Sequence, residues 1–337
     1  MKYTQSRPAP RRVELDVTDR KILAALAENV RLPASWIAKR IGMSRDAVSY
    51  RIANLKKRGI VQGTRVLVDA AQLGFMSTHI FLQLNQPLPE AEKKLIETFQ
   101  AYPFVRAIIK FNGKYDFELA VVHKNIQELD TIIDRIITDS SAYLQHYDIL
   151  FLTKTLAARA FPRNFLSEKQ AIAIKKHHYK DRGRVDAVDL RMLGLLSENA
   201  DIPLHELGSA VGLSADGAKY RLRSMQASGL IRKFIPVINY DVIGYNTYAI
   251  MLSIKDFTAQ REATLREFCN QNKDVLWGSK CIGRFNVLLY ICTRDPNDLV
   301  ATTTALRTHF AGAITEYETL INYEEYKYVY FLKSMAS

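Results

Sequence analysis

The sequence predicts an α+β protein made of two consecutive copies of one unit, each a winged helix-turn-helix head followed by a ferredoxin-like βαββαβ domain. Three observations support this prediction: an internal repeat, helical spacing of apolar residues at the start of each copy, and alternating strand and helix patterns after it. When the chain is shifted by 170 residues, its two parts align almost without gaps. Matched positions include Asp16 with Asp186, Pro33 with Pro203, and Tyr50-Arg51 with Tyr220-Arg221. Matches at one offset along so much of the chain indicate a tandem duplication.

The apolar residues of segment 16–60 recur at helical spacing and predict three helices. We expect Thr18 to cap the first helix and Gly42 to end the second in the left-handed conformation. Ser44 would cap the third helix, whose inward residues are Val48, Ile52 and Leu55. The tight turn between the second and third helices is typical of a helix-turn-helix unit. Residues 60–68 are predicted to form a β-wing.

From residue 79 the pattern changes to strands and helices in the ferredoxin-like order. The expected elements are 79–84, 89–101, 105–111, 116–122, 126–139 and 145–152, and, in the second copy, 247–253, 260–272, 275–280, 286–292, 296–310 and 313–321. The chain should therefore divide into a basic arm (1–15), a first head (16–65), a first α/β domain (66–156), a basic linker (157–185) with a short helix at 168–178, a second head (186–235) and a second α/β domain (236–337).

Charge is distributed unevenly over these segments. The net charge is +12. The first head holds eleven basic and four acidic residues, whereas the second head holds six of each. The arm carries +3 and the linker +6, while the two α/β domains are slightly acidic. A concentration of positive charge in one small head favours a polyanionic partner such as nucleic acid.

Several classes of protein do not fit the composition. No run of 18 apolar residues indicates a membrane helix, and the polar, basic start does not resemble a secretory signal. The three cysteines, Cys269, Cys281 and Cys292, have no CxxC spacing, which argues against a disulfide framework and a zinc site. We expect a cytoplasmic protein with no metal, no cofactor and no membrane partner. Among common catalytic motifs, Walker A, GxGxxG, HExxH and GxSxG are missing, so no catalytic residue is assigned. His177-His178, in the linker, is interpreted as a solvated pair.

The third helix of the first head is the candidate DNA-reading element. Its outward residues are Ser44, Arg45, Asp46, Ser49, Tyr50, Arg51 and Lys56. Arg45 could contact guanine through two hydrogen bonds, while Arg51 and Lys56 would hold phosphates. In the second head, phosphate contacts would come from Lys219, Arg221 and Arg223. That head has Ala215 in place of Arg45, and a glycine within its helix costs roughly 1 kcal/mol relative to alanine. We therefore expect the first head to dominate DNA affinity.

The sequence resembles the Lrp/AsnC (feast/famine) transcription regulators over residues 16–155 and again over 186–325. The matching stretches are Leu15-Asp16 with Asp19, residues 37–63 (IAKRIGMSRDAVSYRIANLKKRGIVQG), Leu73-Gly74-Phe75 and Gly113-Lys114-Tyr115-Asp116-Phe117. The resemblance implies binding to double-stranded DNA, β-sheet-mediated assembly into homo-oligomers, and an amino-acid-like effector near the G-x-Y-D turn. The corresponding effector residues are Gly113, Tyr115 and Asp116, and, in the second copy, Gly283, Phe285 and Asn286. A purely structural hairpin is the alternative for that turn, and Asn286 in place of Asp116 weakens the case for amine binding in the second copy.

The chain departs from that family by carrying two units, since a usual member has one and dimerises. It is therefore expected to be a built-in pseudodimer, whose free edge strands could join chains. Two other functions stay open. Siroheme decarboxylases resemble fused pairs of such units, but carry Arg- and His-rich stretches where this chain has residues 64–68 and 111–114. The heads could also bind other proteins.

Overall fold

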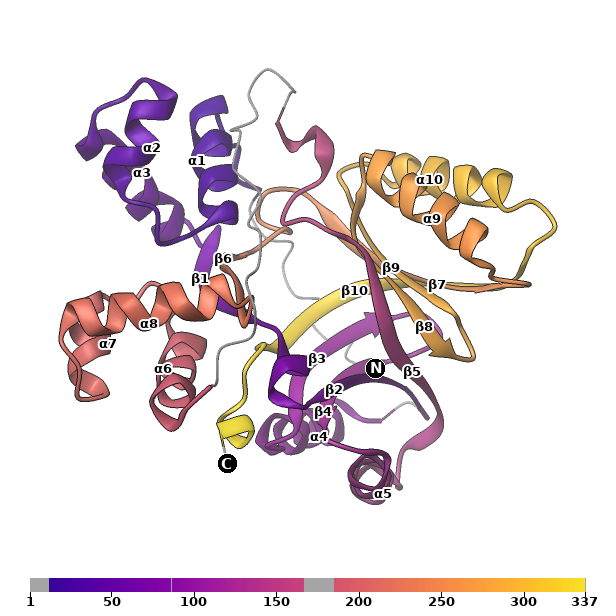
Figure 1. Ribbon diagram of the computed structural model, residues 1–337. Coiled ribbons are helices and arrows are strands. Elements are labelled where there is room, and N and C mark those ends of the chain that lie inside the picture. The colour runs from indigo at the N-terminus through magenta and orange to yellow at the C-terminus, as the bar shows by residue number, and fades with distance from the viewer. Residues whose placement is uncertain (1–11, 86, 167–184, 337) are drawn as a thin grey trace.

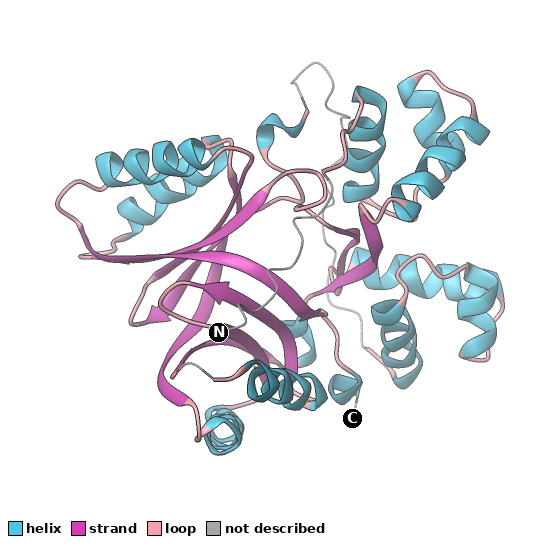
Figure 2. Cartoon of the chain, turned by 180° about the vertical axis from the view of Figure 1, so that it is seen from behind, coloured by secondary structure: helices cyan, strands magenta, loops and turns pink. Residues whose placement is uncertain are grey.

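The computed structural model describes residues 12–85, 87–166 and 185–336 (Figure 1). Two helical heads lie on one side of the molecule, and a β-barrel with helices on its outer surface lies on the other (Figures 1 and 2). The expected linker helix at 168–178, the pair His177-His178 and most of the basic arm fall outside the described residues. The predicted fold class is confirmed: two helix-turn-helix segments are each followed by βαββαβ elements.

Each head contains three helices and one strand. In the first head these are α1 (Val17–Glu28), α2 (Ala34–Ile41), α3 (Arg45–Lys57) and β1 (Val61–Val68). In the second they are α6 (Ala187–Glu198), α7 (Leu204–Ala210), α8 (Ala215–Ala227) and β6 (Ile231–Ile238). The prediction for Gly42 is confirmed, since its φ is 73° at the end of α2. The prediction for Thr18 is wrong: Asp16 is the N-cap of α1, and its carboxylate accepts a 2.7 Å hydrogen bond from the Asp19 N–H.

The expected wings pair with each other. Strand β1 is antiparallel to β6, in a register that runs from Val61 opposite Ile238 to Val68 opposite Ile231. Helix α1 contacts β6, and α6 contacts β1, so each head packs against the strand of the other. The two heads therefore share one two-stranded sheet.

The α/β elements follow the predicted order in both copies. The first domain contains β2 (Met76–Leu84), α4 (Pro89–Ala101), β3 (Val105–Asn112), β4 (Phe117–His123), α5 (Ile126–Ser140) and β5 (Leu144–Ala158). The second contains β7 (Asn246–Ile254), α9 (Ala259–Gln271), β8 (Val275–Gly283), β9 (Val287–Thr293), α10 (Pro296–His309) and β10 (Ile314–Tyr328). Strands β5 and β10 have 15 residues each and are longer than expected, because each pairs first within its own domain and then with the other domain.

The two α/β domains close into one eight-stranded barrel in the order β10-β3-β4-β2-β5-β8-β9-β7. Its interior is filled with large apolar side chains from both copies, including Phe81, Phe111, Leu150, Met251, Leu288 and Leu320. Helices α4 and α5 cover the outer surface of one part, and α9 and α10 cover the other (Figure 2). Closure confirms the expected pseudodimer. The expectation that free edge strands of the α/β domains join chains is wrong, because the barrel uses every edge of both four-stranded sheets.

Close approach of the two domains explains the glycine at the end of β8. Gly283 has a φ of 153°, and a Cβ placed on it would lie 2.2 Å from the Ile149 carbonyl oxygen of β5. We expect Gly283→Ala to lower the free energy of unfolding by about 3 kcal/mol, through strain and overpacking. The control is Gly42→Ala: its φ is 73° with no atom within 4 Å of the added Cβ, so it should cost only about 1–2 kcal/mol. Urea denaturation measures both, and equal losses would contradict the close approach.

An ion-pair cluster also joins the domains. Glu262 of α9 is bonded to Lys154 of β5, and it contacts Arg266 and Lys280 at 3.2 and 3.3 Å. Lys154 is the largest of the influences that lower the pKa of Glu262 to about 2. A carboxylate with a lowered folded-state pKa stabilises the fold above its ordinary pKa of 4.5, and that contribution disappears as the pH falls toward 2.

We therefore expect the stability difference between the wild type and Glu262→Gln to be constant above about pH 5 and to shrink between pH 4.5 and 2. Denaturant titrations at a series of pH values measure that difference. Glu267→Gln, on the same helix but without an ion pair among the described residues, is the control. A difference that does not vary with pH would argue against the ion-pair cluster.

Candidate nucleic-acid interface

Helix α3 begins directly after the tight turn of the first head. The Ser44 side chain accepts a 3.2 Å hydrogen bond from the Ala47 N–H, and Ser214 caps α8 in the same way through the Gly217 N–H at 3.1 Å. The inward positions of α3 are occupied as predicted, with Val48 and Leu55 fully buried and Ile52 partly so. These contacts fix which side of the helix faces outward.

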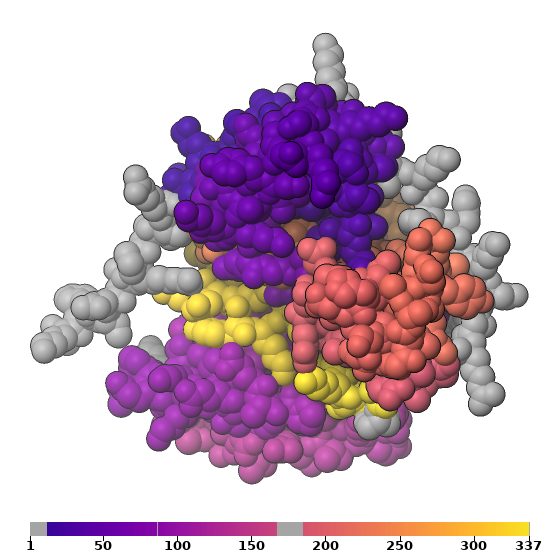
Figure 3. All heavy atoms as spheres, turned by 90° about the vertical axis from the view of Figure 1, so that its left-hand side faces the viewer, coloured from indigo at the N-terminus to yellow at the C-terminus, as the bar shows by residue number. Residues whose placement is uncertain are grey.

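The outward side of each third helix presents a tyrosine at the same position. Tyr50 is 73% exposed and Tyr220 is 75% exposed. Arg45, Asp46 and Ser49 are also exposed. Lys39, Arg45 and Lys57 make no ion pair with any residue in the described part of the chain. Figure 3 views the side of the molecule that carries both heads. The first head therefore has unpaired cations beside an accessible helix.

Arg51 and Arg221 are engaged within their own heads. Arg51 contacts Asp16 and Asp19, both at 2.7 Å, and ties α3 to the start of α1. Arg221 makes the equivalent contacts with Asp186 and Asp189 at 2.8 and 2.9 Å. The hydrogen bond from the Asp189 N–H, together with Arg221, lowers the pKa of the Asp186 carboxyl. Each of these arginines therefore holds the third helix of its own head against the start of the first helix. Contacts from Arg51 and Arg221 to phosphates stay a prediction.

Contacts between the heads set their relative position. Arg31 donates hydrogen bonds of 2.9 Å to the carbonyl oxygens of Ala200 and Ile202 in the second head. Lys233 of β6 contacts Glu28 at 3.0 Å. Lys56, predicted to hold a phosphate, lies 3.7 Å from Asp201. The predictions missed Arg31, although the repeat offered one signal: Arg31 and Asp201 occupy equivalent positions and carry opposite charges.

The G-x-Y-D turns have structural contacts in both copies. Asp116 accepts a 2.7 Å hydrogen bond from the Leu84 N–H, and burial raises the pKa of its carboxyl. Asn286 pairs with the N–H and carbonyl of Ile254 at 2.9 and 2.8 Å. Tyr115 and Phe285 are fully buried in the barrel. A Cβ on Gly113 would lie 2.8 Å from Leu320 Cδ2, as one on Gly283 would crowd Ile149. These contacts agree with the structural alternative, and effector binding stays a prediction.

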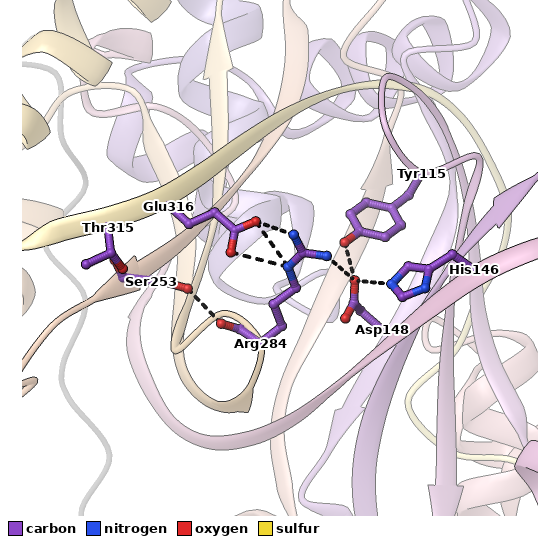
Figure 4. A network of polar contacts seen from close by, with 7 residues as sticks. All are labelled: Tyr115, His146, Asp148, Ser253, Arg284, Thr315 and Glu316. Carbon is purple, nitrogen blue, oxygen red and sulfur yellow. Dashed lines mark hydrogen bonds and ion pairs between the residues drawn. The ribbon is translucent and has the colours of Figure 1, made fainter.

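A charged cluster lies beside the turns, where the two domains meet (Figure 4). Asp148 of β5 accepts hydrogen bonds from the Tyr115 hydroxyl, from His146 at 3.1 Å and from Arg284 at 3.4 Å. Arg284 follows β8 and also pairs with Glu316 of β10. All three donors reach Asp148 Oδ2, so its second oxygen, Oδ1, can still accept a hydrogen bond. No sequence spacing indicated this cluster, because its residues come from four separate segments.

A second polar cluster is buried inside the barrel. Glu118 is 1% exposed and accepts hydrogen bonds from the Tyr290 hydroxyl and from His79 Nδ1. Arg106 lies 3.2 Å from His79 Nε2. Because a guanidinium can only donate, Nε2 is the acceptor in that contact and Nδ1 is the donor to Glu118. This cluster joins β2, β3 and β4 of the first copy to β9 of the second.

Further observations concern the cysteines, possible metal ligands and membrane helices. The three cysteines are free and buried. Within the described residues, no group of three or more His, Cys, Asp or Glu side chains is placed to hold a metal ion. Likewise, no described helix is both long and apolar enough to span a membrane.

Known proteins resemble the chain at two levels. A family model described as an AsnC-type helix-turn-helix domain matches residues 15–56 and again 185–226. An uncharacterized HTH-type transcriptional regulator of Pyrococcus horikoshii is 30% identical over 126 residues, which cover 37% of this chain and 78% of that protein. The regulatory protein AsnC of Haemophilus influenzae is 26% identical over 148 residues, or 44% of this chain and 93% of that protein.

The structure of the siroheme decarboxylase NirDL resembles the whole chain. The similarity covers 95% of this chain and 96% of that one, with a TM-score of 0.60 and 15% sequence identity. At this identity the comparison shows a shared fold, including the tandem arrangement of two heads and two α/β domains.

Proposed function

Because the chain belongs to the Lrp/AsnC family of AsnC-type helix-turn-helix proteins, we propose that it is a sequence-specific DNA-binding transcription regulator. The observation that carries the proposal is the accessible, capped helix α3 beside Lys39, Arg45 and Lys57, which have no ion pair within the described residues. That head has a net charge of +7. Sequence relatives of one unit's length are named as transcriptional regulators, which supports the same function.

In this mechanism α3 enters the major groove, N-terminal residues first. Arg45 is the first residue of α3, so its guanidinium can reach the O6 and N7 acceptors of a guanine. Lys39 at the end of α2 and Lys57 at the end of α3 would neutralise phosphates on either side of the groove. Arg51 contributes indirectly, by holding α3 against α1.

The remaining assignments follow from that function. The heads are taken as 16–65 and 186–235, and the α/β domains as 66–156 and 236–337, with the latter pairing the two copies. An amino-acid-like effector would bind beside the G-x-Y-D turn, where Asp148 Oδ1 could accept a hydrogen bond from its amine. Association between chains would use surfaces other than the strand edges of the closed barrel.

Footprinting of the full chain on its own promoter, with and without amino acids, tests the proposal. We expect the protein to protect a DNA site at low salt. If an amino acid acts as an effector, adding it should change the protected site or the affinity for DNA. A mixture of genomic fragments provides an independent search for sites. Failure to protect or retain any fragment at low salt would reject DNA binding.

A second candidate is a siroheme-decarboxylase-like enzyme, favoured by the full-length similarity to NirDL. A related structure of that protein is described as a co-complex with an iron-uroporphyrin III analogue. The two stretches expected to be rich in Arg and His hold only Arg65 and Lys114 as basic residues, and Arg65 pairs with Glu325 at 2.6 Å. Titration with an iron tetrapyrrole separates the functions: a saturable change in the Soret absorbance would favour the enzyme.

A further inference from the structure

We propose that one chain recognises an operator without dyad symmetry, and binds it in one orientation only. This inference rests on the proposed DNA binding and concerns the kind of DNA site. It follows from two structural facts. The two heads are held together as a pseudosymmetric pair, and they present different cations from equivalent positions.

The heads cannot act as independent modules. Strands β1 and β6 form one sheet, and Arg31 is hydrogen-bonded to Ala200 and Ile202 across the contact between the heads. Lys233 and Glu28 add an ion pair from the opposite side. The spacing and relative orientation of α3 and α8 are thereby fixed within one chain. Two identical heads in such an arrangement read a palindrome, because operator symmetry mirrors protein symmetry.

The helices themselves are built alike. Both have a serine N-cap, an exposed tyrosine at the same position, and an arginine paired with two aspartates of the first helix of the head. Any difference in what they read must therefore come from the remaining outward side chains.

Those side chains differ systematically. Six basic residues surround α3, and none has a basic counterpart in the second head. Lys39, Arg40, Arg45, Lys56, Lys57 and Arg58 correspond to Ser209, Ala210, Ala215, Gln226, Ala227 and Ser228. Of the six, Arg58 also contacts Asp19 at 3.4 Å and Lys56 lies 3.7 Å from Asp201. Conversely, the second head has exposed Lys219 and Arg223 where the first has Ser49 and Ala53. These two cations are four residues apart, on one side of α8.

The positions of the cations imply different half-sites. In the first head they lie at the end of α2 and at both ends of α3, with Arg45 as the first residue of α3, which suits a guanine contact flanked by phosphate contacts. In the second head they lie in the middle of α8, and Ala215 offers no side-chain donor at the first position of the helix. One half-site should require guanine where the other does not, so the operator has a direction.

Selection of bound sequences from a random DNA library tests this with the full chain. Wild type should yield a motif without dyad symmetry. The exchange variant Arg45→Ala/Ala215→Arg moves one arginine between equivalent, exposed first positions of the two helices, so it should move the guanine preference to the other half-site. It should also bind the wild-type motif about 10-fold more weakly.

A palindromic wild-type motif, or an unchanged motif from a folded exchange variant, would overturn the proposal. If the exchange variant does not fold, Lys219→Ser/Arg223→Ala gives the second test: it should alter only the half-site opposite the guanine, and alteration of both would count against an oriented site. Absence of any selected sequence with wild type would instead reject DNA binding itself.

Discussion

Glu118→Leu is expected to lower the free energy of unfolding by about 3–5 kcal/mol, because it removes the shared acceptor of a buried hydrogen-bonded cluster. Without the carboxylate, the Tyr290 hydroxyl and the His79 Nδ1–H lose their acceptor. Since Tyr290 belongs to the second copy, the substitution also weakens the pairing of the two domains. Urea denaturation followed by circular dichroism measures the loss.

Tyr290→Phe is the matched control for that substitution. It removes one hydrogen bond but leaves Glu118 in contact with His79, so its cost should be only about 1–2 kcal/mol. If Glu118→Leu proves no more destabilising than Tyr290→Phe, the buried cluster does not hold the domains together.

Replacing the three unpaired cations of the first head should produce the largest loss of DNA binding. Lys39→Ser/Arg45→Ala/Lys57→Ala introduces the residues found at the equivalent positions of the second head. We expect affinity for the selected operator to fall by about 100-fold or more, since the base contact alone contributes about 1–3 kcal/mol. The log–log salt dependence should also become shallower, by about 0.9 for each phosphate contact removed. Fluorescence anisotropy at several salt concentrations measures both quantities.

Two comparisons make the result specific. Lys219→Ser/Arg223→Ala, which gives the second head the residues of the first, should cost less affinity. All of these side chains are exposed, so thermal unfolding should change little. Equal losses from both heads would contradict the dominance of the first. Arg51, which the sequence predicts to hold a phosphate, is unsuitable for such a test. Its replacement would also release α3 from Asp16 and Asp19.

Local signals predicted the elements of this fold well. Helix α4 spans the predicted residues 89–101, because Pro89 at its start and the apolar spacing within it are local features. The residue types do not show whether Asp16 or Thr18 is the N-cap of α1, since both types serve there. The hydrogen bond from the Asp19 N–H identifies Asp16 as the cap. The pairing of β1 with β6 and the extension of β5 and β10 depend on contacts between copies, which short-range patterns do not encode.

For the functional residues, too, the sequence predicts sites built from neighbouring residues better than sites built from distant ones. The capped α3 was recognised because its motif is contiguous. The clusters around Glu118 and Asp148 were missed, since their members come from separate strands of both copies. The repeat did hold one usable signal for the first of them: His79, Arg106 and Glu118 have Ala249, Leu276 and Leu288 as counterparts. Polar residues whose counterparts in the other copy are apolar mark a site where one duplicated domain can no longer replace the other.

The salt dependence of full-chain binding to a DNA fragment from its own promoter tests the central claim most directly. The proposed function predicts saturable binding at about 50 mM salt and a log–log slope of about −2 or steeper, from at least two neutralised phosphates at about −0.9 each. Saturable binding that is insensitive to salt, or no binding at low salt, would contradict the assignment of this tandem protein as a DNA-binding regulator.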